Sequence, residues 1–279
     1  MKLRYPALPP GWYPRNQEEI TLFLRNKAAP LNAPAAVAPH AGWFYSGAIA
    51  AAAVSALKQA ETIAVLGGHL PPGTPPLFAH EEGVRTPMGD VLLDAGLRDI
   101  LERELGGKED RYDDNTVEVL LPMVRFFHPA ARILWMRLPA ERSSFEAGKA
   151  IARAAETTGR KIAVLGSTDL THYGRNYGFS PRGSGREAFA WVTEVNDRLF
   201  IRAVESGDPA EILARAESDK SACSAGAVLG AAGYASAMGV PRARLLAYGT
   251  SAGAPAGANA GAGEIPDSFV GYAAFAFGG

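Results

Sequence analysis

The sequence has little of several features that mark particular classes of protein. Its single cysteine, Cys223, excludes an internal disulfide framework. It has no apolar run of about 20 residues, the length that a helix needs to cross a bilayer. Its 28 basic and 29 acidic residues form no long run of one sign, so the basic stripe of a nucleic-acid-binding protein is lacking. The N-terminus has no apolar signal-peptide core. We therefore expect a cytoplasmic protein with no nucleic-acid or membrane partner.

What the sequence does contain is the composition and pattern of a globular α/β protein. Apolar residues make up 47 % of the 279 residues, and charged residues 20 %. Strands are predicted at residues 35–39, 62–66, 131–138, 161–165, 244–248 and 268–277, the first five as buried parallel strands. Helices are predicted at residues 48–59, 94–105, 144–156, 186–204, 209–217 and 225–237. This alternation predicts a parallel sheet with helices on both faces.

The chain shows no linker that would divide it. Residues 1–279 are therefore expected to form one domain. The one biased segment is rich in Gly and Ala and covers residues 251–264, where we expect a surface loop rather than a phosphate-binding loop.

Three of the five histidines follow predicted strands. His40 comes directly after AAVAP, and His69 after TIAVLGG. His172 follows KIAVLGSTDLT, with Asp169 three residues before it. Ligand sites in open α/β sheets form outside the carboxyl ends of the strands. If these strands are parallel neighbours, the three histidines converge on one crevice.

Cys223 lies in a polar segment directly before the small-residue helix predicted at residues 225–237. A thiol near a helix N-terminus has a lowered pKa, because the helix dipole and free N–H groups favour the thiolate. The thiolate is both the nucleophilic and the metal-binding form of cysteine. Cys223 is therefore a candidate for the same crevice as the histidines.

Two chemistries could use these residues. His40, His69 and Cys223 would form a metal site, and two imidazoles with one thiolate suit iron, copper or zinc better than magnesium or calcium. Alternatively, Cys223 would be the nucleophile of a metal-free cysteine hydrolase, with His172 as its base and Asp169 orienting the imidazole. The residues alone leave both chemistries open.

The motifs resemble, in order and spacing, those of a known family. They are RYPALPPGWYPRNQEEI, APHAGWFYSG, LGGH, RTPMGDV, DDNTVEVLLP, GSTDLTHYG and the helix that follows Cys223, and they run along almost the whole chain. The most specific are APHAGWFYSG and STDLTHYG. Together they resemble the Memo-like proteins, which include the B component of the AmmeMemoRadiSam group. That family is related to the class III (LigB-type) extradiol dioxygenases.

The resemblance implies a three-layer α/β/α fold with a mostly parallel sheet and a site at the strand ends. His40, His69 and Cys223 match the metal-binding trio of the family. Asp169 and His172 match the acid and the histidine beside it, and His172 would be the proton-transfer group. The expected metal is iron (Fe2+), with copper and zinc as alternatives.

The function implied by the resemblance is that of a dioxygenase-like oxidoreductase acting on a small substrate. The side chains expected to line the substrate cleft are Asn115, Glu118, Tyr45 and Tyr173. The resemblance also allows a non-enzymatic scaffold that holds a peptide or protein partner in the same cleft. Functional association with radical-SAM and AMMECR-type proteins is a further expectation.

This chain departs from the family pattern in two segments. The loop before His69 reads LGGH, which is one residue shorter than the usual Gly-Pro-Ser-His-His and lacks its second histidine. The acidic-His-Ser segment of the family appears here as Asp114, Asn115 and Thr116. An amide such as that of Asn115 can hydrogen-bond a substrate but cannot act as an acid or base near neutral pH.

Overall fold

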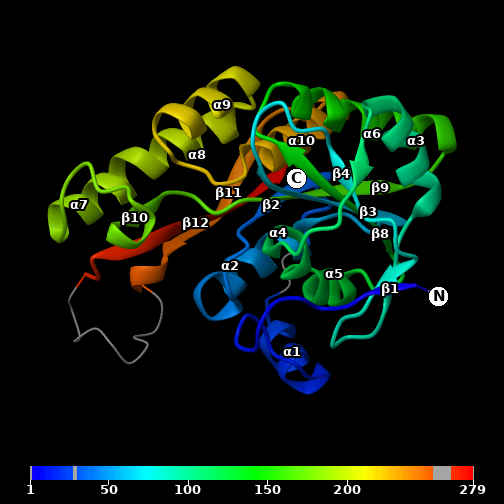
Figure 1. Ribbon diagram of the computed structural model, residues 1–279, viewed down its shortest axis with the longest axis horizontal. Helices are drawn as coiled ribbons and strands as arrows, with labels where there is room; N and C mark the ends of the chain where they lie inside the picture. Colours follow the sequence, from blue (N-terminus) through cyan, green and yellow to red (C-terminus); the bar gives the residue numbers. More distant parts are fainter. Residues whose placement is uncertain (1, 28–29, 254–264, 279) are drawn as a thin grey trace.

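The computed structural model describes residues 2–27, 30–253 and 265–278 and shows a β-sheet with helices on both faces (Figure 1). Among these residues, nine strands form the main sheet. Their order across the sheet is β10 (His172–Gly174), β12 (Ser268–Phe277), β2 (Ala35–Ala38), β9 (Ile162–Ser167), β3 (Thr62–Leu70), β8 (Arg132–Pro139), β4 (Leu77–Phe78) and β7 (Lys108–Glu109), while β11 (Ala243–Thr250) pairs with β12. The expected α/β fold is confirmed.

The centre of the sheet is parallel. Strands β2, β9, β3 and β8 pair in parallel with one another in this order, and Gly166 of β9 lies opposite both Val37 of β2 and Leu66 of β3. Their apolar sequences fit this place, because a central parallel strand is buried on both faces. The carboxyl ends of these strands therefore lie along one edge of the sheet.

One strand prediction is wrong in direction and burial. The segment predicted at residues 244–248 is β11, which pairs antiparallel with β12 and is half-buried along most of its length. Helices contact β11 on both of its faces, which accounts for its apolar residues, but among the described residues its other edge pairs with no strand. Apolar composition alone does not distinguish such a strand from a central parallel one.

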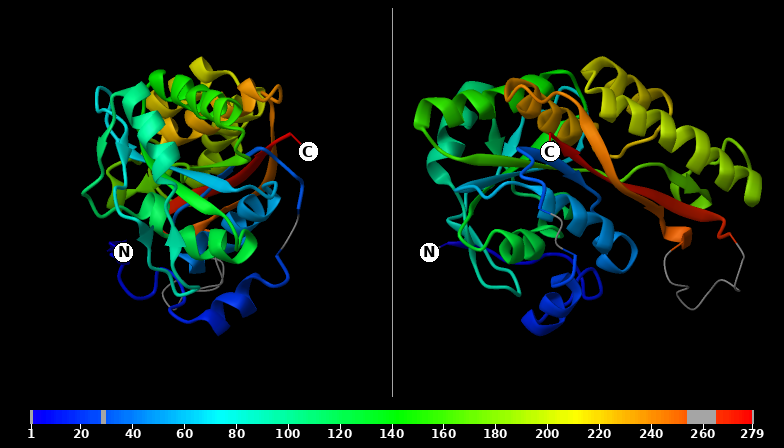
Figure 2. Two further views of the ribbon diagram at one scale, coloured as in Figure 1. Left: turned by 90° about the vertical axis from the view of Figure 1, so that its right-hand side faces the viewer. Right: turned by 180° about the vertical axis from the view of Figure 1, so that it is seen from behind.

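Helices cover both faces of the sheet, as Figures 1 and 2 show. One layer contains α3 (Ala95–Leu105), α6 (Ser143–Thr158), α8 (Asp197–Ser206), α9 (Pro209–Ser218) and α10 (Ala225–Ala237). The other contains α1 (Gln17–Leu24), α2 (Trp43–Ala56), α4 (Asn115–Glu118) and α5 (Leu121–Phe127). The described helices include none with the length and apolar character needed to cross a bilayer.

Smaller elements complete the described chain. A separate small sheet contains β1 (Leu3–Arg4), β5 (Gly83–Val84) and β6 (Val91–Leu92). The helix predicted at residues 186–204 is α7 (Arg186–Trp191) and α8, joined by the π-helical turn Val192–Asn196. Most of the Gly/Ala-rich segment, residues 254–264, lies outside the described residues, so the loop predicted there is not tested.

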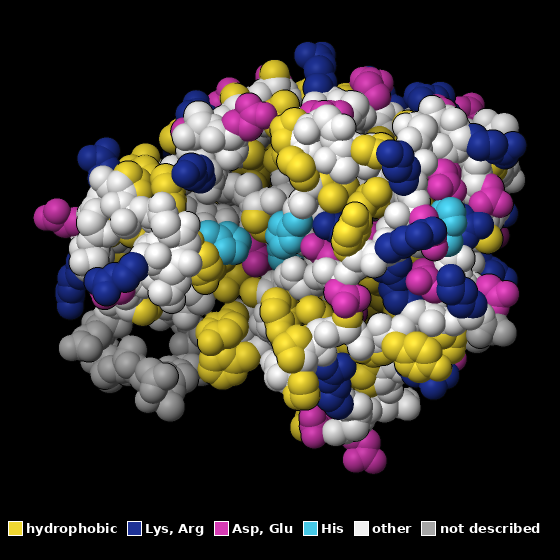
Figure 3. All heavy atoms as spheres, viewed as in Figure 1, with side chains coloured by type: hydrophobic (Ala, Val, Ile, Leu, Met, Phe, Trp, Pro, Cys, Tyr) yellow, Lys and Arg dark blue, Asp and Glu magenta, His cyan; other side chains and the backbone are white. Residues whose placement is uncertain are grey.

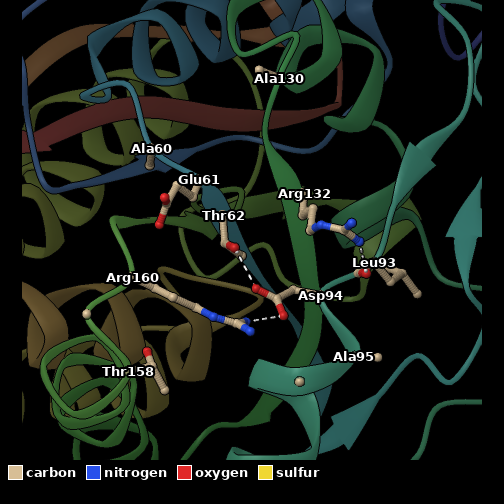
Figure 4. A pocket seen from close by; sticks show the side chains of 12 residues that line it. Ala60, Glu61, Thr62, Leu93, Asp94, Ala95, Ala130, Arg132, Thr158 and Arg160 are labelled. Atoms are coloured by element: carbon tan, nitrogen blue, oxygen red, sulfur yellow. Dashed lines mark hydrogen bonds and ion pairs between the residues drawn. The ribbon is translucent and has the colours of Figure 1, made fainter.

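A pocket of about 780 Å³ lies at the amino ends of β3 and β8, on the opposite edge of the sheet from the predicted site (Figure 4). Two of its charged groups, Asp94 and Arg160, pair with each other. The Asp94 carboxylate accepts a hydrogen bond from the Thr62 hydroxyl at 2.7 Å and pairs with Arg160. Asp94 also caps α3 by accepting from the Leu97 N–H at 3.0 Å. These polar groups hold the start of α3 against the sheet.

Helix α10 is built from small residues and is buried almost all round. Its glycines lie where neighbouring backbones approach closely. A Cβ on Gly226 would overlap the Pro139 carbonyl oxygen, and a Cβ on Gly148 of α6 would overlap the carbonyl oxygen of Gly230 in α10. The contact between α6 and α10 is therefore made by backbone atoms.

We predict that Gly148→Ala lowers the free energy of unfolding by about 1–3 kcal/mol, because the added methyl group forces these two close-packed helices apart. Chemical denaturation measures the effect. Gly253→Ala is the matched control, since its Cβ would meet nothing closer than the Thr250 hydroxyl at 3.9 Å. Equal stability of the two variants would contradict the prediction, because the two helices would then accommodate the methyl group without cost.

Candidate metal centre

His40 lies two residues beyond β2 and is fixed at both its backbone and its ring. Its N–H donates to the Asp169 carboxylate at 2.8 Å, and its Nδ1 lies 2.8 Å from the Ser167 hydroxyl. Its Nε2 lies 3.2 Å from the Cys223 sulfur. The side chain is buried, so these contacts leave one orientation of the imidazole, with Nε2 facing the thiol.

Cys223 contacts His40 from the segment that precedes α10. It directly precedes Ser224, the N-cap residue of α10, and its own side chain is half-buried. Its N–H donates to the Asp169 carbonyl at 3.3 Å, and the Asp169 N–H donates to the sulfur at 3.3 Å. This reciprocal contact joins the loop after β9 to the start of α10.

His69 lies near the end of β3, where the pairing with β8 becomes irregular between Gly67 and Leu70. Its backbone is left-handed, with a φ of 59°. Its ring is perpendicular to that of His40, with the ring centres 5.0 Å apart. Its Nδ1 lies 3.1 Å from the Asp114 carboxylate. The LGGH segment, predicted as a loop, is thus the last part of β3 and brings His69 beside His40.

The three side chains form a group that could hold a metal ion. One ligand atom from each of His40, His69 and Cys223 lies within 4.8 Å of the other two. Ligands bound at the usual lengths of about 2.0–2.3 Å stand roughly 3–4 Å apart, so a small contraction brings this group to binding distance. Two imidazoles and a thiol suit iron, copper or zinc.

The protonation states of these three side chains depend on one another. Burial opposes ionisation of Cys223, but the charges and hydrogen bonds of His40 and His69 outweigh it and hold the pKa of the thiol well below its usual value. Burial likewise opposes protonation of His69, but the Asp114 carboxylate and Cys223 raise its pKa to about 10. The pKa of His40 is also raised, since Cys223 and Asp169 overcome the effect of burial. The site therefore favours a thiolate between imidazolium groups.

Asp169 and His172 lie next to this group. Burial raises the pKa of the Asp169 carboxyl, with Cys223 adding to the shift and His40 and His172 opposing it. His172 begins β10, and its Nδ1 lies 3.1 Å from the Leu170 carbonyl. The imidazoles in contact with the thiol are therefore those of His40 and His69, whereas His172 is close enough to Asp169 for their charges to interact.

Two further predicted site residues bind other parts of the protein. Asn115 donates from its amide to the His40 carbonyl at 3.1 Å, so it steadies the loop that carries that histidine. The Glu118 carboxylate accepts from the Ala7 N–H and the Tyr13 hydroxyl, both at 2.8 Å. Glu118 thus fastens the N-terminal segment to the domain.

The two predicted tyrosines differ in exposure. Tyr173 is fully buried, and its hydroxyl donates to the Gly183 carbonyl at 3.1 Å. Tyr45, in the first turn of α2, is 50 % exposed and lies in edge-to-face contact with Phe44. Tyr177 is also partly exposed and contacts the His172 ring edge-to-face, with the ring centres 5.0 Å apart. Tyr45 and Tyr177 are the aromatic groups available near the site.

The surface is hollowed on this side of the molecule. Figure 3 shows histidine side chains in the hollow, with hydrophobic side chains beside them. The pKa of Tyr177 is raised by burial and by the charges of Asp169 and Tyr45, so these three groups lie near one another.

Sequence reasoning missed two residues that support the site. Ser167, the last residue of β9, holds Nδ1 of His40. Arg137 lies in the buried strand β8 and pairs with Asp114 at 3.2 Å. A charged residue inside the apolar run ILWMRLP was a usable signal, because a buried arginine needs an acidic partner.

We predict that Cys223 in metal-free protein reacts with iodoacetamide at pH values below the usual range for a thiol. His40→Ala removes an imidazolium that stabilises the thiolate, so the midpoint of the rate profile moves to higher pH. Alkylation rates followed by mass spectrometry over about pH 5–10 test this around the ordinary thiol pKa. His80→Ala is the control, since His80 pairs with Glu102 at 3.0 Å. Identical profiles for wild type and His40→Ala would contradict the assignment.

Comparison with known proteins identifies the family. The family model described as Memo-like protein matches residues 4–275. A MEMO1 family protein of Pyrococcus abyssi is 30% identical over 271 residues, covering 89% of this chain and 93% of that protein. Another, of Archaeoglobus fulgidus, is 28% identical over 289 residues and 99% of each chain. The crystal structure of an uncharacterised Escherichia coli K12 protein aligns with a TM-score of 0.45 and 12% identity over 88% of this chain and 99% of that one. The resemblance of the motifs is thereby confirmed, and this chain belongs to the Memo-like family.

Proposed function

We propose that this protein is a metal-dependent oxidoreductase of the dioxygenase-like type, with one metal ion held by His40, His69 and Cys223 and iron as the expected metal. The observation that carries the proposal is the convergence of these three ligand atoms within 4.8 Å. They come from the ends of two parallel strands and from the start of a helix, so no single local motif accounts for their meeting. When bound, such a metal supplies Lewis-acid or redox chemistry at open coordination positions.

The chain's own groups prepare the site for a cation. Cys223 is biased toward the thiolate, which is the form that binds metal. The raised pKa values of His40 and His69 mean that metal binding must displace protons from the imidazoles. Metal affinity should therefore increase as the pH rises.

His172 is the proposed proton-transfer group. Its Nδ1 faces the Leu170 carbonyl, a contact that favours a proton on Nδ1 and leaves Nε2 free to accept or donate one. Asp169 lies beside it, buried and able to offset the charge of a protonated His172. A histidine outside the ligand group can move a proton without leaving the metal.

The substrate proposed for this cleft is a small organic molecule or a peptide side chain. Tyr45 and Tyr177 provide partly exposed rings near Asp169. An uncharged, partly apolar group would fit such walls better than a polyanion.

We predict that protein purified without chelator, or reconstituted anaerobically with Fe(II), contains about one metal ion per chain, because the three ligands form one binding site. Cys223→Ala and His40→Ala should each lose most of this metal, because each removes one of the three ligands. His172→Ala should retain it. Elemental analysis after gel filtration measures the ratio.

His80→Ala is the control for loss of a histidine in general, because His80 lies in a separate ion pair with Glu102. Wild-type protein that stays metal-free after anaerobic reconstitution would overturn the proposal. Metal retained by Cys223→Ala and His40→Ala would place the ion at another site.

A second candidate is a metal-free cysteine hydrolase, favoured by the 3.2 Å contact between the Cys223 sulfur and Nε2 of His40. In this arrangement His40, rather than the expected His172, would be the base, with the Asp169 carboxylate 3.9 Å from the same nitrogen. A stable acyl-enzyme formed by the metal-free protein with an activated ester would support it. Metal bound stoichiometrically at Cys223 would exclude it, since the thiolate cannot serve both roles at once.

A further inference from the structure

The backbone of His69 is held in a conformation that a histidine adopts only with support. Its φ of 59° is left-handed, where the Cβ of any residue but glycine crowds its own backbone. It occurs where the ladder between β3 and β8 is interrupted, so the regular strand pairing does not impose it. Such strain persists only where surrounding contacts determine the geometry.

Asp114 supplies one part of that support. One carboxylate oxygen lies 3.1 Å from Nδ1 of His69, and the other accepts from the N–H and the hydroxyl of Thr116. The Thr116 hydroxyl oxygen in turn accepts from the Gly68 N–H at 3.2 Å. Asp114 and Thr116 thus hold both the ring of His69 and the peptide group between Gly67 and Gly68.

Arg137 supplies the other part. Its side chain is only 5% exposed and lies with one Nη 3.2 Å from the Asp114 carboxylate and with Nε donating to the Gly68 carbonyl at 3.0 Å. Its second Nη lies 3.4 Å from Asp110, whose side chain is fully buried. The Trp135 indole N–H donates to Asp110 at 3.0 Å. Every charge in this cluster has a partner, as buried ions require.

We propose that Asp114 and Arg137 are positioning residues for His69. Asp114 takes the hydrogen on Nδ1, so Nε2 is the nitrogen left with a free lone pair for a metal. Arg137 holds both the carboxylate and the Gly68 carbonyl, so ring and backbone are fixed together. This inference rests on the proposed metal-binding function. A carboxylate that orients a ligating histidine usually raises metal affinity by limiting the ring to one orientation.

The test is titration of the metal-free full-length chain with Co(II), whose visible spectrum reports thiolate ligation and coordination geometry. Asp114→Ala and Arg137→Lys should each weaken Co(II) binding about 10- to 100-fold and should change the ligand-field bands. Asp113→Ala is the matched control: it removes the neighbouring exposed carboxylate and should leave both affinity and spectrum unchanged. Circular dichroism and thermal unfolding of the metal-free variants establish that they are folded.

The conservative variant Asp114→Asn keeps the shape of the side chain if Asp114→Ala fails to fold, and it should still weaken binding because an amide is a poorer acceptor for the imidazole N–H. Folded Asp114 variants with wild-type affinity and spectrum would overturn this inference alone. Equal weakening by Asp113→Ala would also overturn it, since the loss of any nearby negative charge would then account for the weaker binding. Wild-type protein that binds no Co(II) at all would overturn the proposed function and this inference with it.

Discussion

Strands β2, β9 and β3 pair in parallel, so the chain leaves all three of them at the same edge of the sheet. This pairing brings His40, His69 and Asp169 together although they are far apart in sequence. Because β9 lies between β2 and β3, the residues after it contact both sides of the site. Asp169 accordingly binds the backbone of His40 and exchanges hydrogen bonds with Cys223. A different strand order would separate these side chains even if every strand were preserved.

Electrostatic balance is the second condition of the site. A buried thiolate would be costly alone, and so would a buried imidazolium; side by side, each stabilises the other. Asp114 and Arg137 extend the balance outward, so that His69 meets a carboxylate and the carboxylate meets a buried cation. Opposite charges therefore alternate from the Cys223 sulfur toward the interior of the protein. A divalent cation in the group would replace the protons that now supply the positive charge.

Local pattern predicted the central strands and the placement of His40, because an apolar run followed by a polar residue at a turn is visible in the sequence itself. It also placed Cys223, because a polar segment directly before a small-residue helix is equally visible. The support of His69 could not be predicted in the same way. It depends on a left-handed turn and on which acid faces Arg137, and both are set by tertiary contacts. The partner of Glu118 could not be predicted either. The sequence around a carboxylate at a helix end is the same whether the carboxylate faces a ligand or, as here, the N-terminal segment.

The backbone contact between α6 and α10 has a consequence for evolution of the site. Gly148 and Gly233 at this contact, and Gly226 against Pro139 of β8, let carbonyl oxygens of one segment touch the chain of the next. Side chains can change rotamer to absorb a substitution, but touching backbones cannot. The start of α10, and the Cys223 sulfur with it, is therefore placed with the small tolerance of a van der Waals contact. Side chains around the hollow can change while the position of the Cys223 sulfur stays fixed.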